Sequence, residues 1–304
     1  MRVVSIGECM VELREAGGGL LSKSFAGDAY NTAVYLKRSA PGAQVQFLSV
    51  TGADPLSLAM RAAWRAEGVD DAPAFTDPDR EVGLYLIELD AAGERRFHYW
   101  RQASAARQWM QQLRAGGGDP LSGADLVYLS GVSLAILPAE EQQQALLLMR
   151  WLHGRVGAIA FDPNIRPALW PNLGVARAVV EAAIGLCDIV LPSADDLALL
   201  YGPAAPEALA AKLWRLHARE IALTLGADGC LVVTPEGRAA LPAPEVCGVD
   251  TSGAGDSFNG AYLAARLSGA PPGKAAEAAL AVASRVVTAP GAIVPAAVSH
   301  PQEP

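Results

Sequence analysis

Short apolar runs rich in β-branched residues alternate along this chain with longer segments of helical pattern. The runs span 3–6, 45–50, 126–129, 158–161, 189–191 and 221–225, and the helical segments include 57–67, 140–152 and 175–186. Strands separated by helices are joined by crossovers and therefore run parallel. Because the runs are apolar throughout, both faces of the sheet are expected to be covered. The sequence predicts an α/β fold, a three-layer αβα sandwich with a mostly parallel sheet and right-handed connections.

One segment departs from this alternation. Residues 83–89 and 95–101 are two strand-like runs joined by a short, glycine-containing connection at 90–94, which predicts a hairpin outside the main sheet. In the second run Phe97, Tyr99 and Arg101 fall on one face. A lid over a binding site and a surface hairpin with one half-buried face fit this pattern equally well.

The charge and composition exclude some classes of partner. With 24 basic and 32 acidic side chains the chain carries a net charge of -8, so it lacks the basic field that nucleic acid or an anionic membrane surface requires. No apolar run has the length of a membrane span, and the N-terminus lacks the pattern of an export signal. The four cysteines are scattered. We therefore expect one domain over 1–304, located in the cytoplasm, with no nucleic-acid or membrane partner.

The strongest local motif is the segment 249–267, VDTSGAGDSFNGAYLAARL. Gly253, Ala254 and Gly255 precede a segment of helical spacing, so backbone N–H groups at the helix start are open to an anion such as a phosphate. Asp256 falls where an N-cap or first-turn carboxylate would fall. From spacing alone, capping of the helix is the favoured role for Asp256.

The stretch DTSGAGDSF resembles the C-terminal signature of the ribokinase-like, or PfkB, family of carbohydrate kinases. The resemblance implies an ATP-dependent kinase with a ribokinase-like αβα fold and a small β lid. It also implies that Asp256 takes the proton of the acceptor hydroxyl while Gly253, Ala254 and Gly255 bind the phosphoryl anion. An ordinary aspartate is a weak base, but phosphoryl transfer depends mainly on alignment and charge neutralisation.

Further segments extend the resemblance over the chain. FAGDAYNTAVYL resembles the family's sugar-binding signature, which implies sugar-binding roles for Gly27, Asp28 and Asn31. ALTLGADGCLV resembles the segment near the nucleotide, which implies ATP-binding roles for the following residues: Thr224, Gly226, Asp228 and Gly229. Ser193 and Asp196 stand where the family usually has an asparagine and a glutamate that help to hold magnesium. Since an N-cap serine followed by first-turn acids explains them equally well, the metal-binding residues stay unassigned.

Five segments resemble one branch of the family, the kinases of the sugar acid 2-keto-3-deoxygluconate: IGECMVEL, GLYLIELDAAGERRFHYWR, YLSGVSLAIL, FDPNIRPALW and GAIVP. The resemblance implies a lid formed near 9–16 and 83–101. It implies contacts with the sugar acid from Tyr85, Tyr99, Arg101 and Arg166, with Asn164 and Arg166 near the nucleotide. A planar guanidinium fork suits a carboxylate, although a lone arginine is more often a solvated surface residue.

The sequence thus predicts phosphorylation of 2-keto-3-deoxygluconate at its terminal hydroxyl by ATP with magnesium, and leaves a monovalent cation open. Two alternatives remain: a fructokinase or ribokinase type of enzyme acting on a neutral sugar, and a metabolite sensor without catalysis. In this family an exposed lid often forms a dimer interface, so we expect a homo-oligomer. The segment after Gly291 is expected to be loosely held.

Overall fold

The computed structural model describes residues 1–89, 95–116 and 118–300. The main sheet orders its strands β15-β14-β13-β12-β11-β10-β1-β4-β6, and all neighbours pair in parallel except β13 with β14 and β14 with β15. Its strands are β1 (Arg2–Ile6), β4 (Gln44–Leu48), β6 (Val69–Asp70), β10 (Leu126–Ser130), β11 (Ile159–Asp162), β12 (Ile189–Val190), β13 (Glu220–Thr224), β14 (Cys230–Thr234) and β15 (Gly237–Leu241). The mostly parallel sheet is confirmed, with an antiparallel edge that the alternation of runs did not predict.

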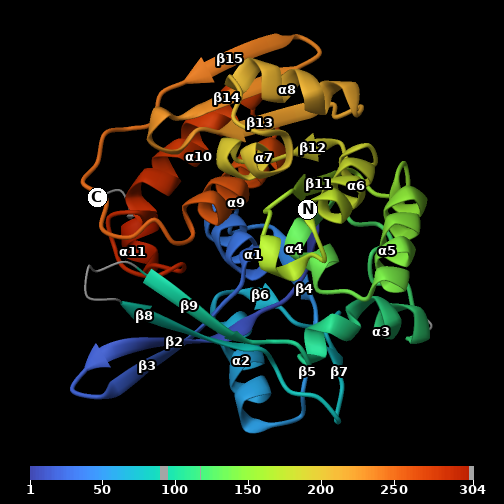
Figure 1. Cartoon of the computed structure of the whole chain (residues 1–304), viewed down its shortest axis with the longest axis vertical. Coiled ribbons are helices and arrows are strands. Elements are labelled where there is room, and N and C mark those ends of the chain that lie inside the picture. The colour runs from blue at the N-terminus through green and yellow to red at the C-terminus, as the bar shows by residue number, and fades with distance from the viewer. Residues whose placement is uncertain (90–94, 117, 301–304) are drawn as a thin grey trace.

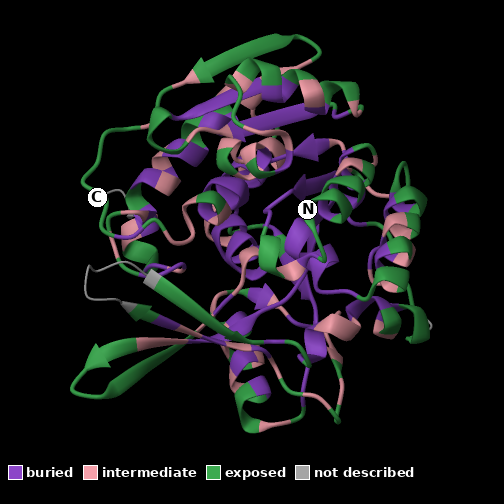
Figure 2. Ribbon diagram, viewed as in Figure 1, coloured by how far each residue is buried: buried purple, intermediate pink, exposed green. Residues whose placement is uncertain are grey.

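Helices cover both faces of this sheet, as Figures 1 and 2 show. One face carries α3 (Trp109–Ala115), α4 (Gly131–Ala135), α5 (Ala139–Leu152), α6 (Leu173–Ile184), α7 (Ala194–Tyr201) and α8 (Pro206–Arg215), and the other carries α1 (Asp28–Ser39), α2 (Pro55–Ala66), α9 (Ala254–Leu267) and α10 (Pro272–Val286). Alternate residues of β1 enter the two cores: Val4 and Ile6 pack on the first face and Val3 on the second. The three-layer αβα sandwich is confirmed.

Helices α1 and α9 pack against each other at unusually close range because Gly260 lies between them. A Cβ atom at Gly260 would stand 2.6 Å from the backbone oxygen of Thr32 and 2.6 Å from the backbone nitrogen of Leu36. Any larger residue would force the helices apart. This contact brings the start of α1 beside the start of α9, although the two starts are separated by more than 200 residues of sequence.

A second, smaller sheet orders its strands β3-β2-β8-β9 and projects from one side of the main body (Figure 1). Its strands are β2 (Met10–Gly17), β3 (Leu20–Ala26), β8 (Leu84–Leu89) and β9 (Arg95–Trp100). Strand β8 pairs antiparallel with β9, with Tyr85 opposite Tyr99, while the expected connection at 90–94 lies outside the described residues. The inward face packs Met10, Tyr85 and Ile87 against Ala292.

The segment after Gly291 is not loosely held, so that expectation was wrong up to His300. Val294 is buried, and its N–H donates to the hydroxyl of Tyr35, which itself donates to the carbonyl oxygen of Ala292. The segment ends in α11 (Ala296–Ser299).

The run at 45–50, expected as one strand, is divided into β4 and the short β5 (Val50–Thr51), which pairs with β7 (Phe75–Thr76). Within the described ranges, no helix combines the length and apolar character needed to cross a bilayer.

Candidate active site

Asp256 lies in the first turn of α9 and accepts a hydrogen bond from Asn31 in α1. The Asn31 Nδ2 to Asp256 Oδ2 distance is 2.7 Å, and Asn31 Oδ1 accepts from the N–H of Gly27 at 3.2 Å. The amide of Asn31 thereby joins the two helix starts that Gly260 holds together. Helix α9 has Gly253 as its N-cap residue with no side-chain cap. Capping, the role favoured by spacing alone, is therefore not the role of Asp256.

The environment of Asp256 makes it a stronger base than an ordinary aspartate. Burial and, to a smaller extent, the negative charge of Asp28 raise the pKa of Asp256 to about 7, against the lowering effects of the Asn31 hydrogen bond and the charge of Arg166. A carboxyl with a pKa near neutrality can both accept and release a proton at physiological pH. This property follows from burial and could not be read from the motif.

A chain of amides and carboxyls extends from this base toward the main sheet. Asn164 Nδ2 donates to Asp28 at 2.6 Å, and the N–H of Asn164 donates to Asp162 at 3.0 Å. Asn259, one turn after Asp256, donates to the other oxygen of Asp162 at 2.9 Å. Burial, helped by nearby acidic side chains, raises the pKa of Asp162 well above its usual range.

Sequence reasoning missed Asp162 and Asn259. A usable signal was present for Asp162, because it ends a predicted parallel strand, and ligands bind at the carboxyl ends of such strands.

The turn before α9 leaves room for an anion. Gly253 has φ of +72°, and a Cβ atom there would collide with the carbonyl oxygen of Ala292. Around Gly255, in contrast, a Cβ would meet nothing within 4 Å, and the residue is exposed, so the space beside its Cα is open. The first-turn N–H groups of a helix have no intrahelical acceptors, and together with the helix dipole they attract negative charge. The two glycines thus serve different purposes, close packing at Gly253 and open access at Gly255.

The residues expected near the nucleotide lie along the neighbouring strand ends. Thr224 ends β13 and its N–H donates to the carbonyl oxygen of Pro192, beside Ser193. Gly226 and Asp228 form a 3₁₀ turn, and Gly229 follows with φ of +101°. In the described part of the chain, no hydrogen bond joins these residues to Asp256 or its partners, so they form a separate group on the same edge of the sheet.

Ser193 caps α7, since its Oγ accepts from the N–H of Asp196 at 3.0 Å, which is the capping role that the sequence left open. Arg166 Nη1 lies 3.5 Å from Asp196 Oδ1, and burial raises the pKa of Asp196. Among the residues described, no group of three or more carboxylates, histidines or cysteines forms a metal cluster.

The two arginines expected to bind a carboxylate differ in environment. The Arg166 side chain is 53% exposed, and its Nη1 donates to the carbonyl oxygen of Ile165 at 3.0 Å and lies 3.5 Å from Asp196 Oδ1. Arg101 is buried and forms an ion pair with Glu8, which is 1% exposed and also accepts from Ser104 Oγ at 2.5 Å. Arg101 Nε is buried with no hydrogen-bond partner in the described structure. Glu8 therefore offsets the charge of Arg101, whereas the charge of Arg166 remains largely available.

Tyr99 lies among the charges of this region. Burial raises its pKa, the positive charges of Arg101 and Arg166 lower it, and Asp28 raises it. Its ring stands 5.8 Å from the Arg101 guanidinium. Tyr85, its cross-strand partner, is buried and donates its hydroxyl proton to Glu12. The small sheet thus brings Tyr85, Tyr99 and Arg101 together, and the charge of Arg166 also acts on Tyr99.

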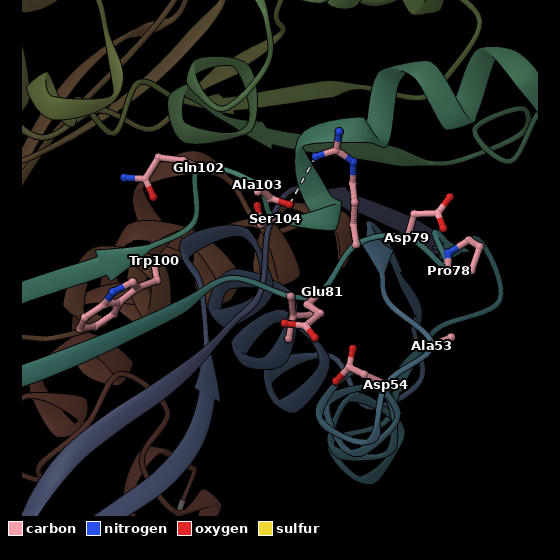
Figure 3. Close-up of a pocket in the computed structure, with 11 residues that line it drawn as sticks. Ala53, Asp54, Pro78, Asp79, Glu81, Trp100, Gln102, Ala103 and Ser104 are labelled. Carbon is pink, nitrogen blue, oxygen red and sulfur yellow. Dashed lines mark hydrogen bonds between the residues drawn. The ribbon is translucent and has the colours of Figure 1, made fainter.

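A cavity of about 790 Å³ lies at the base of the small sheet and is separate from this group. Figure 3 shows Trp100, Glu81 and Asp54 around it, with Ser104 at its wall. No residue predicted for the site lines it. The cavity adjoins the Glu8–Arg101 pair through Ser104, whose Oγ donates to Glu8, and through Gln102, whose side chain accepts from the Arg101 N–H at 3.3 Å.

Comparison with known proteins adds the following. The model of the pfkB family of carbohydrate kinases matches residues 1–298. A 2-dehydro-3-deoxygluconokinase of Escherichia coli K12 is 36% identical over 97% of each chain. Fructokinase-1 of Oryza sativa is 31% identical over 86% of this chain and 81% of its own. The structure of a Vibrio cholerae fructokinase with fructose, ADP and calcium ion bound superposes with a TM-score of 0.83 at 26% identity, covering 96% of this chain and 94% of that one.

The two glycines of the turn give a first prediction. Gly253→Ala forces a side chain against Ala292 at a left-handed backbone position, so we expect a fall in Tm of about 4 °C or more. Gly255→Ala places a methyl group in open space inside a helix, where alanine is favoured over glycine, so its Tm should equal or slightly exceed that of the parent. Thermal unfolding followed by circular dichroism measures both. Equal Tm values for the two variants would contradict the assigned packing.

Proposed function

The chain belongs to the PfkB family of carbohydrate kinases, and from this membership we propose that it transfers a phosphoryl group from ATP to the terminal hydroxyl of 2-keto-3-deoxy-D-gluconate. One observation carries the proposal: a half-buried carboxylate with a pKa of about 7 stands in the first turn of a helix whose start is open at Gly255, within the electrostatic influence of Arg166. The full-length similarity to 2-dehydro-3-deoxygluconokinases supports the choice of substrate. We also propose a cytoplasmic location, which is typical of this kinase family.

In the proposed reaction Asp256 accepts the proton of the acceptor hydroxyl as that oxygen attacks the γ-phosphorus of ATP, the bond from this phosphorus to the bridging oxygen breaks, and ADP leaves. Asn31 holds the carboxylate in place, and its own orientation is fixed by the N–H of Gly27. The N–H groups of Gly255 and its neighbours bind the transferring group, whose charge grows on its outer oxygens. Magnesium, when bound with ATP, neutralises phosphate charge. Asp196 is the carboxylate we propose to lie nearest to it, and a monovalent cation remains an open requirement.

The carboxylate end of the substrate would face the arginines. Arg166 is the stronger candidate because its guanidinium is exposed and only loosely paired. Arg101 would contribute mainly through its unpartnered Nε and by holding Tyr99, since Glu8 already offsets its charge. Gly27, Asp28 and Asn31 would contact the sugar hydroxyls, while Thr224, Gly226, Asp228, Gly229 and Asn164 would border the nucleotide. The small sheet would close over the sugar as a lid.

The second prediction tests Asp256. Asp256→Asn keeps the hydrogen bond geometry and removes the base, so turnover should fall by about 10²-fold or more while ATP still binds. In the parent, kcat/KM should fall as the pH drops below about 7, because the carboxyl becomes protonated there. The residual activity of the variant should lack this acidic limb. An unchanged acidic limb in Asp256→Asn would assign the titration to another group.

The third prediction concerns substrate choice, measured as the ratio of kcat/KM for 2-keto-3-deoxygluconate over fructose. Arg166→Met should lower this ratio by about 30-fold or more, since a carboxylate left without its cation loses at least ~2 kcal/mol. Arg166→Lys should recover only part of the lost ratio, because the lysine ammonium cannot bind both carboxylate oxygens as the planar guanidinium group does. Arg177→Met, which removes an exposed arginine of α6 paired with Glu181, is the matched control.

Arg101→Met leaves Glu8 buried without its cation and should therefore lower Tm as well as the ratio. The double variant with Glu8→Gln should recover most of the lost Tm and not the ratio. If the ratio stays at the parental value in both the Arg166→Met and the double variant, the arginines do not select the acid. In that case a neutral sugar becomes the better proposal.

We also propose that a second copy of the chain covers the outward face of the small sheet. That face carries apolar side chains around a cavity of about 640 Å³ at the start of α2, including Leu84, Leu86 and the 57% exposed Trp100. As a fourth prediction, the parent should sediment as a dimer or larger species, and Trp100→Glu should shift it toward the monomer. Trp214→Glu, on the exposed side of α8, is the control. A monomeric parent would refute this interface.

A further inference from the structure

We propose that Arg14 is a positioning residue that links the small sheet to the anion-binding turn before α9, an inference that rests on the proposed kinase function. Arg14 lies in β2, and its guanidinium stands between two carboxylates. Nη2 is 3.2 Å from Glu12 Oε1 and Nη1 is 3.5 Å from Asp250 Oδ2. Glu12 belongs to the small sheet, whereas Asp250 belongs to the loop that leads into Gly253.

On the side of the small sheet, Arg14 is fastened to the residues that face the site. Glu12 is buried and accepts hydrogen bonds from the Tyr85 hydroxyl and from Ser24 Oγ, the latter at 2.9 Å. Tyr85 lies directly across from Tyr99, with ring centroids 5.7 Å apart. A shift of the sheet would therefore move Glu12 and Arg14 together with Tyr85 and Tyr99.

On the side of the turn, Asp250 joins the two loops that shape the anion-binding turn. Its Oδ1 accepts from the N–H of Ser252 at 2.8 Å, and its Oδ2 accepts from the N–H of Gly291 at 2.9 Å. The next residue after Gly291, Ala292, is the wall against which Gly253 packs. The carboxylate that receives Arg14 thus also sets the spacing between the turn and its wall.

The charges explain why this link would matter for catalysis. The Asp250 carboxylate is 9% exposed and stands three residues before Gly253, so it repels a phosphate bound at the turn. Arg14 offsets this negative charge only while the small sheet holds it beside Asp250. The turn is then electrostatically ready for the phosphoryl group when the sheet is closed over the sugar, and less so when it is open.

The test compares Arg14→Met and Arg14→Lys with Lys23→Met, which removes another cation of the same sheet outside this network. ADP release with 2-keto-3-deoxygluconate gives kcat, and calorimetry gives the Kd of ATP. We expect Arg14→Met to lower kcat by about tenfold or more and to raise the Kd by about threefold. Arg14→Lys should recover part of both, and Lys23→Met should match the parent. Millimolar guanidinium should restore part of the kcat of Arg14→Ala but none of that of Asp256→Asn.

Parental kcat and Kd in a folded Arg14→Met would overturn the proposal, and a lowered Tm alone would leave Arg14 only a structural role. Should Arg14→Met fold too poorly to be measured, the other two variants decide. The proposal is equally overturned if guanidinium does not restore the kcat of Arg14→Ala and the kcat of Arg14→Lys equals that of the parent. A parent that binds ATP and phosphorylates no sugar would refute the kinase function instead. In that case a weaker ATP affinity of Arg14→Met than of Lys23→Met still supports the offset of Asp250 by Arg14.

Discussion

The contact between α1 and α9 at Gly260 is the constraint on which the rest of the site depends. Only a residue without a side chain lets the two helix backbones approach so closely. That approach places Asn31 within hydrogen-bond distance of Asp256 and partly buries the carboxyl, and this loss of solvation is the main reason for its raised pKa. The strength of the proposed base is therefore set by helix packing one turn away from it, and not by the acid alone.

Around this rigid centre, charged side chains join the small sheet to the main body at two places. Glu8 and Arg101 pair where the chain enters β2 and leaves β9, and Arg14 reaches Asp250 at the other side of the site. The Glu8–Arg101 ion pair is buried and would be costly to break. The Arg14–Asp250 pair has a longer N–O distance and is partly open to water. The small sheet is thus anchored firmly at one edge and held more weakly at the edge near the turn that precedes α9.

Much of the fold could be predicted from the sequence because it depends on local pattern. The alternation of apolar runs and helical segments gave the parallel sheet, and the glycines around Asp256 gave the open helix start. The antiparallel edge at β14 and β15 and the packed segment after Gly291 were missed, since nothing in their local composition states which distant partner they meet. The partners of the arginines were missed for the same reason: Glu8 lies 93 residues from Arg101, and Asp250 lies 236 residues from Arg14.

The wall formed by Ala292 behind Gly253 also bears on how the protein folds. Gly253 packs against Ala292, which lies some forty residues later in the chain, and Asp256 accepts a hydrogen bond from the side-chain amide of Asn31, near the start of the chain. Contacts of such long sequence separation form late, because the intervening chain must first lose its freedom. In partly folded molecules the helices should therefore form before the proposed phosphate site at the start of α9. A proteolytic fragment that keeps α9 but loses either distant segment would retain the signature sequence without the ability to use ATP.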